Sequence, residues 1–132
     1  MEPYLKTAGV LMMALALIHL FFPRYFRWKE ELAQLSIANR QIMYVHTSFI
    51  AFVVFLMGLL CLSSASDLAK TLLGRKIALG LAIFWTARLP VQFFCYSSVL
   101  WKGKVFETTI HVLFTMLWIY FSSVFTLTYL MV

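Results

Sequence analysis

Charged side chains are scarce in this sequence. Asp, Glu, Lys and Arg make up only 12% of its 132 residues, whereas hydrophobic residues make up 63%. In soluble domains, about a quarter of the residues are charged and about half are apolar. The composition therefore excludes an ordinary soluble domain and predicts an integral membrane protein, and at this length we expect a single domain.

Acidic residues are fewer still. Five Asp and Glu stand against eleven Lys and Arg, which gives a formal net charge of +6. The basic residues occur in short runs between apolar segments, where they set membrane topology and meet anionic lipid head groups. We therefore exclude nucleic acid as a partner and expect the lipid bilayer to be the main one.

The sequence has only two cysteines, Cys61 and Cys95. They lie near the ends of successive antiparallel segments, roughly 25 Å apart at 1.5 Å per residue. A disulfide requires Cα atoms within about 7 Å, so we expect two free thiols. The sequence also lacks a Cys-pair motif, an HExxH motif and a Gly-rich phosphate loop, and its serines have no partners spaced as in a nucleophile triad. No familiar catalytic class is indicated.

Long apolar stretches are what the sequence has in abundance. Each is long enough to cross a hydrocarbon core of about 30 Å. We predict membrane spans over residues 4–22, 41–62, 77–100 and 105–130. The first is interpreted as a retained span, because it has no clearly basic leader and no small residues at a cleavage site. The predicted fold is an all-α, integral membrane four-helix bundle in a single transmembrane domain over residues 1–132.

The segment between the first two spans has a different pattern. Over residues 24–38, Trp28, Leu32 and Leu35 recur at helical spacing, and charged residues occupy the other faces. This pattern predicts a short amphipathic helix that lies in the membrane interface and is anchored by aromatic side chains.

Four spans place both termini on one side of the membrane. The loops on the opposite side carry six basic residues, against four on the side of the termini. The two sets are Arg24, Arg27, Lys29, Arg40, Lys102 and Lys104, and Lys6, Lys70, Arg75 and Lys76. Since basic residues favour the cytoplasmic side, we expect a multi-pass protein of a bacterial inner membrane with both termini on the non-cytoplasmic side.

Arg88 and Gln92 lie within the third span, in surroundings otherwise as apolar as lipid. An arginine at such depth costs from a few to more than about 10 kcal/mol unless it faces protein, water or a counter-charge. His19, His46 and His111 all fall roughly 5 to 10 Å below the same membrane boundary at 1.5 Å per residue. We therefore predict a buried polar pocket near one membrane face.

Helical periodicity indicates which faces would line this pocket. Arg88 and Gln92 continue the row of Trp85, and His111 and Trp118 share a stripe that carries most polar atoms of the fourth span. Such faces point inward because lipid offers no hydrogen-bond partners. For the second span we expect an inward row made of Asn39, Met43, His46, Ile50 and Met57.

Imidazole ligates iron, copper and zinc, which suggests a redox cofactor or a metal ion. His46 and His111, on spans of the same direction, could hold a b-type haem for electron transfer, with Arg88 and Gln92 as polar support. Together with His19 they could instead form a transition-metal site. Without a metal, Arg88, Gln92 and the histidines could bind an anionic or quinone-like head group, or relay protons.

Our first prediction is the cofactor or metal site, and two other functions stay open. The protein could be a non-catalytic accessory or structural subunit of a larger membrane complex or a homo-oligomer, in which polar residues lock helices together. It could also be a small transporter or membrane enzyme for an amphiphilic substrate. The sequence does not decide whether the protein is an enzyme.

Overall fold

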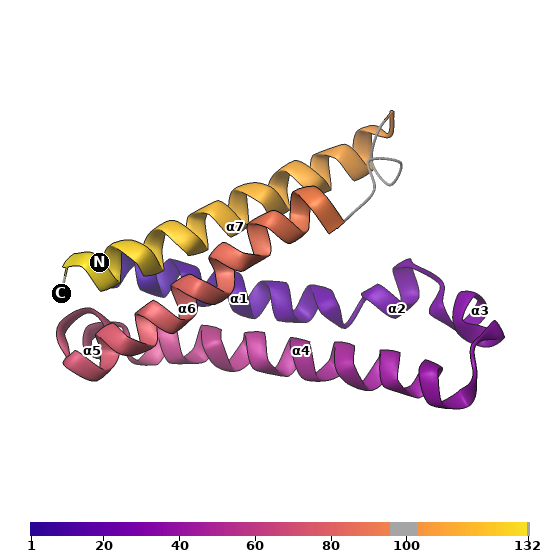
Figure 1. The fold of residues 1–132 in the computed structure, drawn as a ribbon, viewed down its shortest axis with the longest axis horizontal. Helices are drawn as coiled ribbons and strands as arrows, with labels where there is room; N and C mark the ends of the chain where they lie inside the picture. Colours follow the sequence, from indigo (N-terminus) through magenta and orange to yellow (C-terminus); the bar gives the residue numbers. More distant parts are fainter. Residues whose placement is uncertain (96–102, 132) are drawn as a thin grey trace. The chain divides into compact units, whose positions relative to one another are not determined.

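The computed structural model describes residues 1–95 and 103–131. Every regular element in these residues is helical, as predicted (Figure 1). The helices are α1 (Glu2–His19), α2 (Phe22–Tyr25), α3 (Trp28–Glu31), η1 (Leu32–Gln34), α4 (Ile37–Ser63), α5 (Ala65–Lys70), α6 (Leu72–Pro90), η2 (Val91–Cys95) and α7 (Val105–Met131). Of these, η1 is a 3₁₀-helix and η2 a π-helix.

Three helices in the described part of the chain are long and apolar enough to cross a membrane. They are Ile37–Ser63, Leu72–Phe94 and Val105–Met131. They correspond to the predicted spans over 41–62, 77–100 and 105–130, although residues 96–100 lie outside the described residues. This helix content is that of a membrane protein, and the exposed apolar side chains of these helices are compatible with contact with the lipid bilayer.

The first predicted span, over residues 4–22, differs from the other three. Helix α1 has 18 residues, ends at His19 and is not among the three helices above. It carries Glu2 and Lys6 in its first two turns. A four-helix bundle with α1 as a crossing therefore stays a prediction.

Packing divides the chain into two compact units, which we describe separately. The α1/α4 unit is Lys6–Ser63, and the α6/α7 unit consists of Met1–Leu5 and Ser64–Val132. The length of the chain predicts one domain and does not indicate this division.

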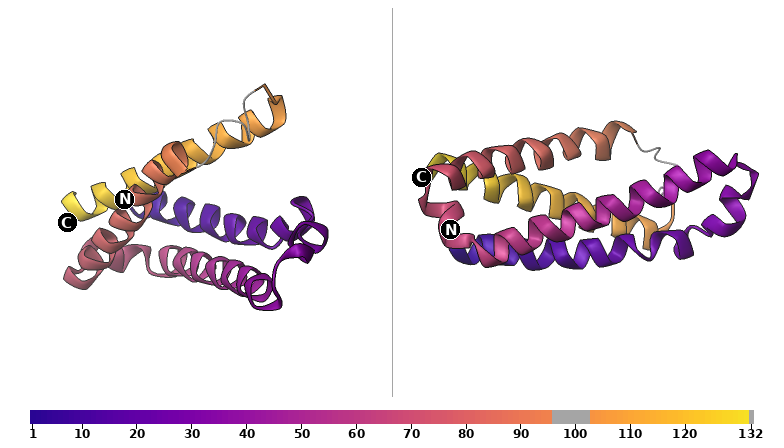
Figure 2. Two further views of the ribbon diagram at one scale, coloured as in Figure 1. Left: turned by 45° about the vertical axis from the view of Figure 1, so that its right-hand side comes forward. Right: turned by 90° about the horizontal axis from the view of Figure 1, so that it is seen from below.

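In the α1/α4 unit the two long helices run antiparallel and side by side (Figures 1 and 2). They meet most closely at two glycines. A Cβ atom on Gly9 would lie 2.6 Å from the Gly58 carbonyl oxygen, and one on Gly58 would lie 2.6 Å from the Gly9 carbonyl oxygen. Small residues permit such backbone contact, which stabilises helix pairs in membranes by close van der Waals packing.

This packing corrects the predicted inward face of the second span. Of the expected row, Asn39, Met43, His46 and Ile50 are exposed and Met57 is half-buried. The buried row of α4 is instead Ala51, Val54, Gly58 and Cys61. The small side chains decide which face packs, because they let the backbones approach, and Asn39 and His46 lie outside that face.

The predicted continuous interfacial helix over residues 24–38 is also corrected. The segment is divided into α2, α3 and η1. Arg27 has a left-handed backbone conformation with φ of 56°, which ends α2 and starts α3 in a new direction. Trp28 is buried and packs edge-on against Tyr44 of α4, with ring centroids 5.4 Å apart. The segment over residues 24–38 therefore packs against α4 through the side chain of Trp28.

The α6/α7 unit is an antiparallel hairpin preceded by α5 (Figure 2). Thr71 caps α6, because its hydroxyl oxygen accepts a bond from the Gly74 N–H at 2.9 Å. At the same end of the hairpin, Arg75 Nε donates to the Tyr129 carbonyl oxygen at 3.0 Å, and its guanidinium lies over the Tyr129 ring. At mid-length, Trp85 stacks on Trp118 with centroids 5.4 Å apart.

A polar cluster between α6 and α7

A change of helix type positions the polar residues of α6. Pro90 has no N–H to donate to the Thr86 carbonyl, and the Val91 N–H bonds to the Arg88 carbonyl instead of continuing the α-helix. The chain then forms the π-helix η2, a type of turn that is frequent at functional sites. Gln92, in the first turn of η2, is only 5% exposed and reaches α7.

Gln92 connects two side chains of α7. Trp118 Nε1 donates to Gln92 Oε1 at 3.3 Å, and Gln92 Nε2 lies 3.0 Å from His111 Nδ1. The three side chains therefore form a chain of hydrogen bonds from Trp118 through Gln92 to His111.

The donor types determine the direction of this chain. An indole N–H can only donate, so Trp118 requires the carbonyl oxygen of the Gln92 amide. The Gln92 NH₂ group then faces His111 Nδ1, which must accept the bond with a lone pair. In a neutral imidazole the proton is consequently on Nε2. A flipped Gln92 amide would oppose two N–H donors at Trp118, which disfavours that orientation.

Arg88 adds a positive charge to the same cluster. Its guanidinium carbon lies 5.1 Å from the centroid of the Trp118 ring, and the residue is half-buried. A cation over an indole face gains about 2 kcal/mol or more when it is desolvated. The guanidinium itself carries five N–H donors. We call Arg88, Gln92, His111 and Trp118 the polar cluster.

The structure brings together three of the five residues predicted for the site. Arg88, Gln92 and His111 are members of the polar cluster. His19 and His46 belong to the α1/α4 unit. His19 Nδ1 lies 2.8 Å from the Leu15 carbonyl oxygen of its own helix, and His46 is exposed on α4 outside the buried row.

Metal binding receives no support from the described residues. No group of three or more His, Cys, Asp or Glu side chains within 1–95 and 103–131 could hold a metal ion. In the polar cluster, His111 uses Nδ1 as an acceptor, so its neutral ring presents a proton at Nε2 where a metal ligand needs a lone pair. The haem or metal site through His46 and His111, with His19, stays a prediction.

Two features of the cluster do not follow from the sequence prediction. Trp118 belongs to the predicted polar stripe of the fourth span, and its position seven residues, about two helical turns, after His111 is the signal for its role as a donor to Gln92. The change of helix type at Pro90 is the second feature. The signal for it was a proline two residues before a buried glutamine.

Comparisons with models of protein families, with characterised proteins and with solved structures found no match to this chain. The fold and the cluster define a helical membrane protein with a hydrogen-bonded polar cluster inside one hairpin. Its function is therefore inferred from the geometry of that cluster.

Proposed function

We propose that this multi-pass membrane protein binds the head group of an amphiphile at Arg88 and His111, with Gln92 holding the His111 ring in its orientation. The observation that carries this proposal is the direction of the hydrogen bonds from Trp118 through Gln92 to His111. That direction makes His111 Nε2–H a donor in the same cluster as the Arg88 guanidinium. The matching head group offers oxygen acceptors, such as the carbonyls of a quinone or the phosphate of an anionic lipid.

The depth of the cluster suits a head group. His111 lies six residues after the start of α7 at Val105, which is about 9 Å along the helix. An amphiphile can reach this level from the membrane boundary and leave its tail in the hydrocarbon core. Arg88 lies one helical turn deeper in the span than Gln92. A charged head group can occupy that depth only if an opposite charge, such as the Arg88 guanidinium, pairs with it.

In this proposal α1 crosses the membrane as well. At 1.5 Å per residue its 18 residues span about 27 Å, close to the thickness of the hydrocarbon core. The contact between Gly9 and Gly58 supports this arrangement, because a helix packed along α4 shares its depth. The protein would then have four crossings.

The cofactor function and the structural function are less well supported. A redox cofactor held by His111 needs a lone pair at Nε2, whereas the Gln92 amide favours a proton there. A purely structural lock would explain Gln92 and Trp118, but it does not require a cation as costly as Arg88 in a membrane span. Binding and folding experiments separate these functions.

The test is a fluorescence titration of the protein in phosphatidylcholine nanodiscs. One arm adds a benzoquinone with a short isoprenoid tail, and the other adds brominated phosphatidylglycerol, since both quench nearby tryptophans. We expect saturable quenching in at least one arm. Arg88→Leu should weaken it at least tenfold, because a charge-assisted hydrogen bond contributes about 1.5 to 3 kcal/mol.

Arg75→Leu is the matched control. Arg75 also stacks on an aromatic ring of α7, with its guanidinium carbon 4.8 Å from the Tyr129 centroid, but it lies outside the polar cluster. Its variant should bind within about twofold of the wild type, well below the effect of removing a charged partner. Quenching in one arm identifies the source of the head group. If neither probe binds, or if folded Arg88→Leu binds like the wild type, the proposal fails.

A further inference from the structure

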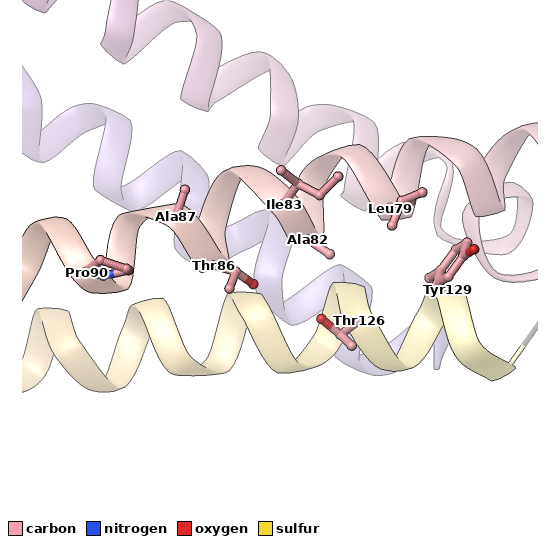
Figure 3. Close-up of a pocket in the computed structure, with 8 residues that line it drawn as sticks. All are labelled: Leu79, Ala82, Ile83, Thr86, Ala87, Pro90, Thr126 and Tyr129. Atoms are coloured by element: carbon pink, nitrogen blue, oxygen red, sulfur yellow. The ribbon is translucent and has the colours of Figure 1, made fainter.

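Helices α6 and α7 border an open groove on another flank of the same hairpin. Its volume is about 450 Å³, and its surface is mostly apolar, with a lining that includes Leu79, Ala82, Ile83, Ala87, Pro90 and Tyr129 (Figure 3). A helix turns about 100° per residue, so Ile83 lies about 140° around α6 from Arg88. The groove is therefore separate from the polar cluster.

The groove runs along the two helices. In Figure 3, Leu79 and Tyr129 lie toward one end of it and Pro90 lies at the other. Pro90 follows Leu79 by eleven residues, which corresponds to roughly 16 Å along a helix. One leaflet is about as thick, since the whole hydrocarbon core measures about 30 Å. An apolar groove of this length and direction suits one acyl chain of a lipid.

A lysine continues the groove-lining row of α6 toward the membrane boundary. Lys76 lies seven residues, close to two helical turns, before Ile83, and it directly precedes the predicted span over 77–100. Its side chain is exposed and makes no ion pair within the described part of the chain. A lysine near the end of a membrane helix lays its methylene groups on apolar surface and extends its ammonium group to the head groups. The groove therefore has an apolar body and a cationic end.

Two neighbouring cations of the α6/α7 unit are engaged by the chain itself. Arg75 Nε donates to the Tyr129 carbonyl oxygen at 3.0 Å, and its guanidinium lies over the ring of the same tyrosine. Lys70 Nζ lies 3.8 Å from Glu2 Oε2. Lys76 is thus the cation of this end of the hairpin that can pair with an anion from outside the chain.

We infer that the groove holds an anionic phospholipid, with one acyl chain along α6 and α7 and the phosphate at Lys76. The apolar lining favours a lipid chain over a polar ligand. The lysine favours a lipid of net negative charge, since a zwitterionic head group carries its own cation beside the phosphate. Lys76 lies near the start of α6 and Arg88 near its end, so this lipid belongs to the opposite leaflet from the polar cluster. The inference does not depend on the proposed function.

The test is native mass spectrometry of the full chain, released from nanodiscs of equimolar phosphatidylglycerol and phosphatidylcholine with the same acyl chains. The measured quantity is the ratio of the two lipids that stay bound. We expect phosphatidylglycerol to exceed phosphatidylcholine about fivefold, because one lysine near an anionic group contributes about 1 kcal/mol. Lys76→Gln should lower the ratio by the same factor. Ala87→Phe should lower it equally, because a chain excluded from the groove no longer brings its phosphate to Lys76.

Lys104→Gln and Ser48→Phe are the matched controls. Lys104 is an exposed lysine at the opposite end of the same hairpin, and Ser48 is an exposed residue of α4. Both variants should keep the ratio of the wild type. Lys76→Gln should lower the ratio in the Arg88→Leu background as well. A lipid bound at the polar cluster then does not account for the effect, and the head-group proposal is tested separately.

Ile83→Trp, which also fills the groove, decides the matter if Ala87→Phe loses helicity by circular dichroism. The inference is overturned if the wild type retains the two lipids equally, because the groove then holds ordinary bilayer lipid. It is also overturned if folded Lys76→Gln or the folded groove variants keep the wild-type ratio. A wild-type dimer that Ala87→Phe separates would overturn it too, since a second copy of the chain would then fill the groove.

Discussion

Gln92 is the side chain that links α6 to the polar residues of α7 by hydrogen bonds. It is almost fully buried, and its two amide atoms face different partners, Trp118 and His111. Removing it would leave the indole N–H without its acceptor and the imidazole nitrogen without its donor. Both groups would then be buried or half-buried in a medium that cannot replace the lost bonds.

Gln92→Met should therefore destabilise the protein by about 1 to 3 kcal/mol, the usual cost of leaving a buried polar group unsatisfied. Thermal unfolding in detergent, followed by near-ultraviolet circular dichroism, measures the change. Ser48→Ala is a suitable control, because the exposed Ser48 hydroxyl bonds to the Tyr44 carbonyl of its own helix. An unfolding midpoint of Gln92→Met equal to that of Ser48→Ala would contradict the structural part of this account.

For individual residues, the sequence predicts which side chains lie close together better than it predicts which hydrogen bonds they form. The helical row of Trp85, Arg88 and Gln92, and the stripe of His111 and Trp118, follow from counting residues, and the structure places these five residues at one interface. The direction of the hydrogen bonds could not be predicted, because it depends on the π-helix after Pro90 and on which amide atom faces which helix.

His46 shows the limit of reasoning from polarity alone. Polarity predicts that this side chain faces the bundle interior, because lipid offers an imidazole no hydrogen-bond partner. In the structure the inward face of α4 is selected by Ala51 and Gly58 instead, so His46 is exposed. Its proposed partnership with His111 in a cofactor site stays a prediction.

The elements are held together by close backbone approach as much as by polar contacts. In the α1/α4 unit, Gly9 and Gly58 leave no room for a side chain, since each hypothetical Cβ lies 2.6 Å from the opposite carbonyl oxygen. Any larger residue must push the helices apart along their length.

Gly58→Ala should consequently destabilise the α1/α4 unit by about 1 to 3 kcal/mol, the range for overpacking a well-packed interface. Gly80→Ala provides a matched substitution, because a Cβ there meets nothing within 4 Å. It should leave the stability unchanged or raise it by up to about 1 kcal/mol through helix propensity. Chemical unfolding of both variants in mixed micelles compares them. Equal stability of the two variants would show that the glycine contact is not a close one.

Long apolar helices were readily predicted and short ones were not. The spans over 41–62 and 105–130 lie within α4 and α7, because runs of this length have few alternatives to a helix. The segment over 24–38 has the periodicity of one helix, but Arg27 adopts a left-handed conformation that breaks it. That conformation costs about 1 to 2 kcal/mol. It immediately precedes Trp28, whose contact with Tyr44 of α4 is a tertiary contact that helical periodicity does not predict.

For the whole molecule, the number of membrane crossings determines on which side each terminus lies. Among the described residues three helices qualify by length and hydropathy, and the proposed crossing of α1 makes four. Four crossings place the two termini on the same side, whereas three place them on opposite sides. The basic residues favour the cytoplasmic side for the loops over 23–40 and 101–104.

Labelling of single introduced cysteines distinguishes the two topologies. Pro3→Cys and Met131→Cys, in a background without Cys61 and Cys95, should react together with an impermeant maleimide in intact cells. Lys29→Cys should react only after permeabilisation, because we expect its loop on the cytoplasmic side. Labelling of one terminus without the other would remove α1 from the crossings and reduce the bundle to three.

The most direct test of head-group binding is the protonation pattern of the His111 ring in the intact protein. Nitrogen-15 NMR in bilayers at mildly alkaline pH, assigned with a His111→Gln variant, reports which ring nitrogen carries the proton. We predict a proton on Nε2, an acceptor lone pair on Nδ1, and a shift of the Nε2 resonance when the binding amphiphile is added, lost in Arg88→Leu. A proton on Nδ1, a metal-coordinated ring, or an Nε2 resonance unaffected by either amphiphile would contradict the account.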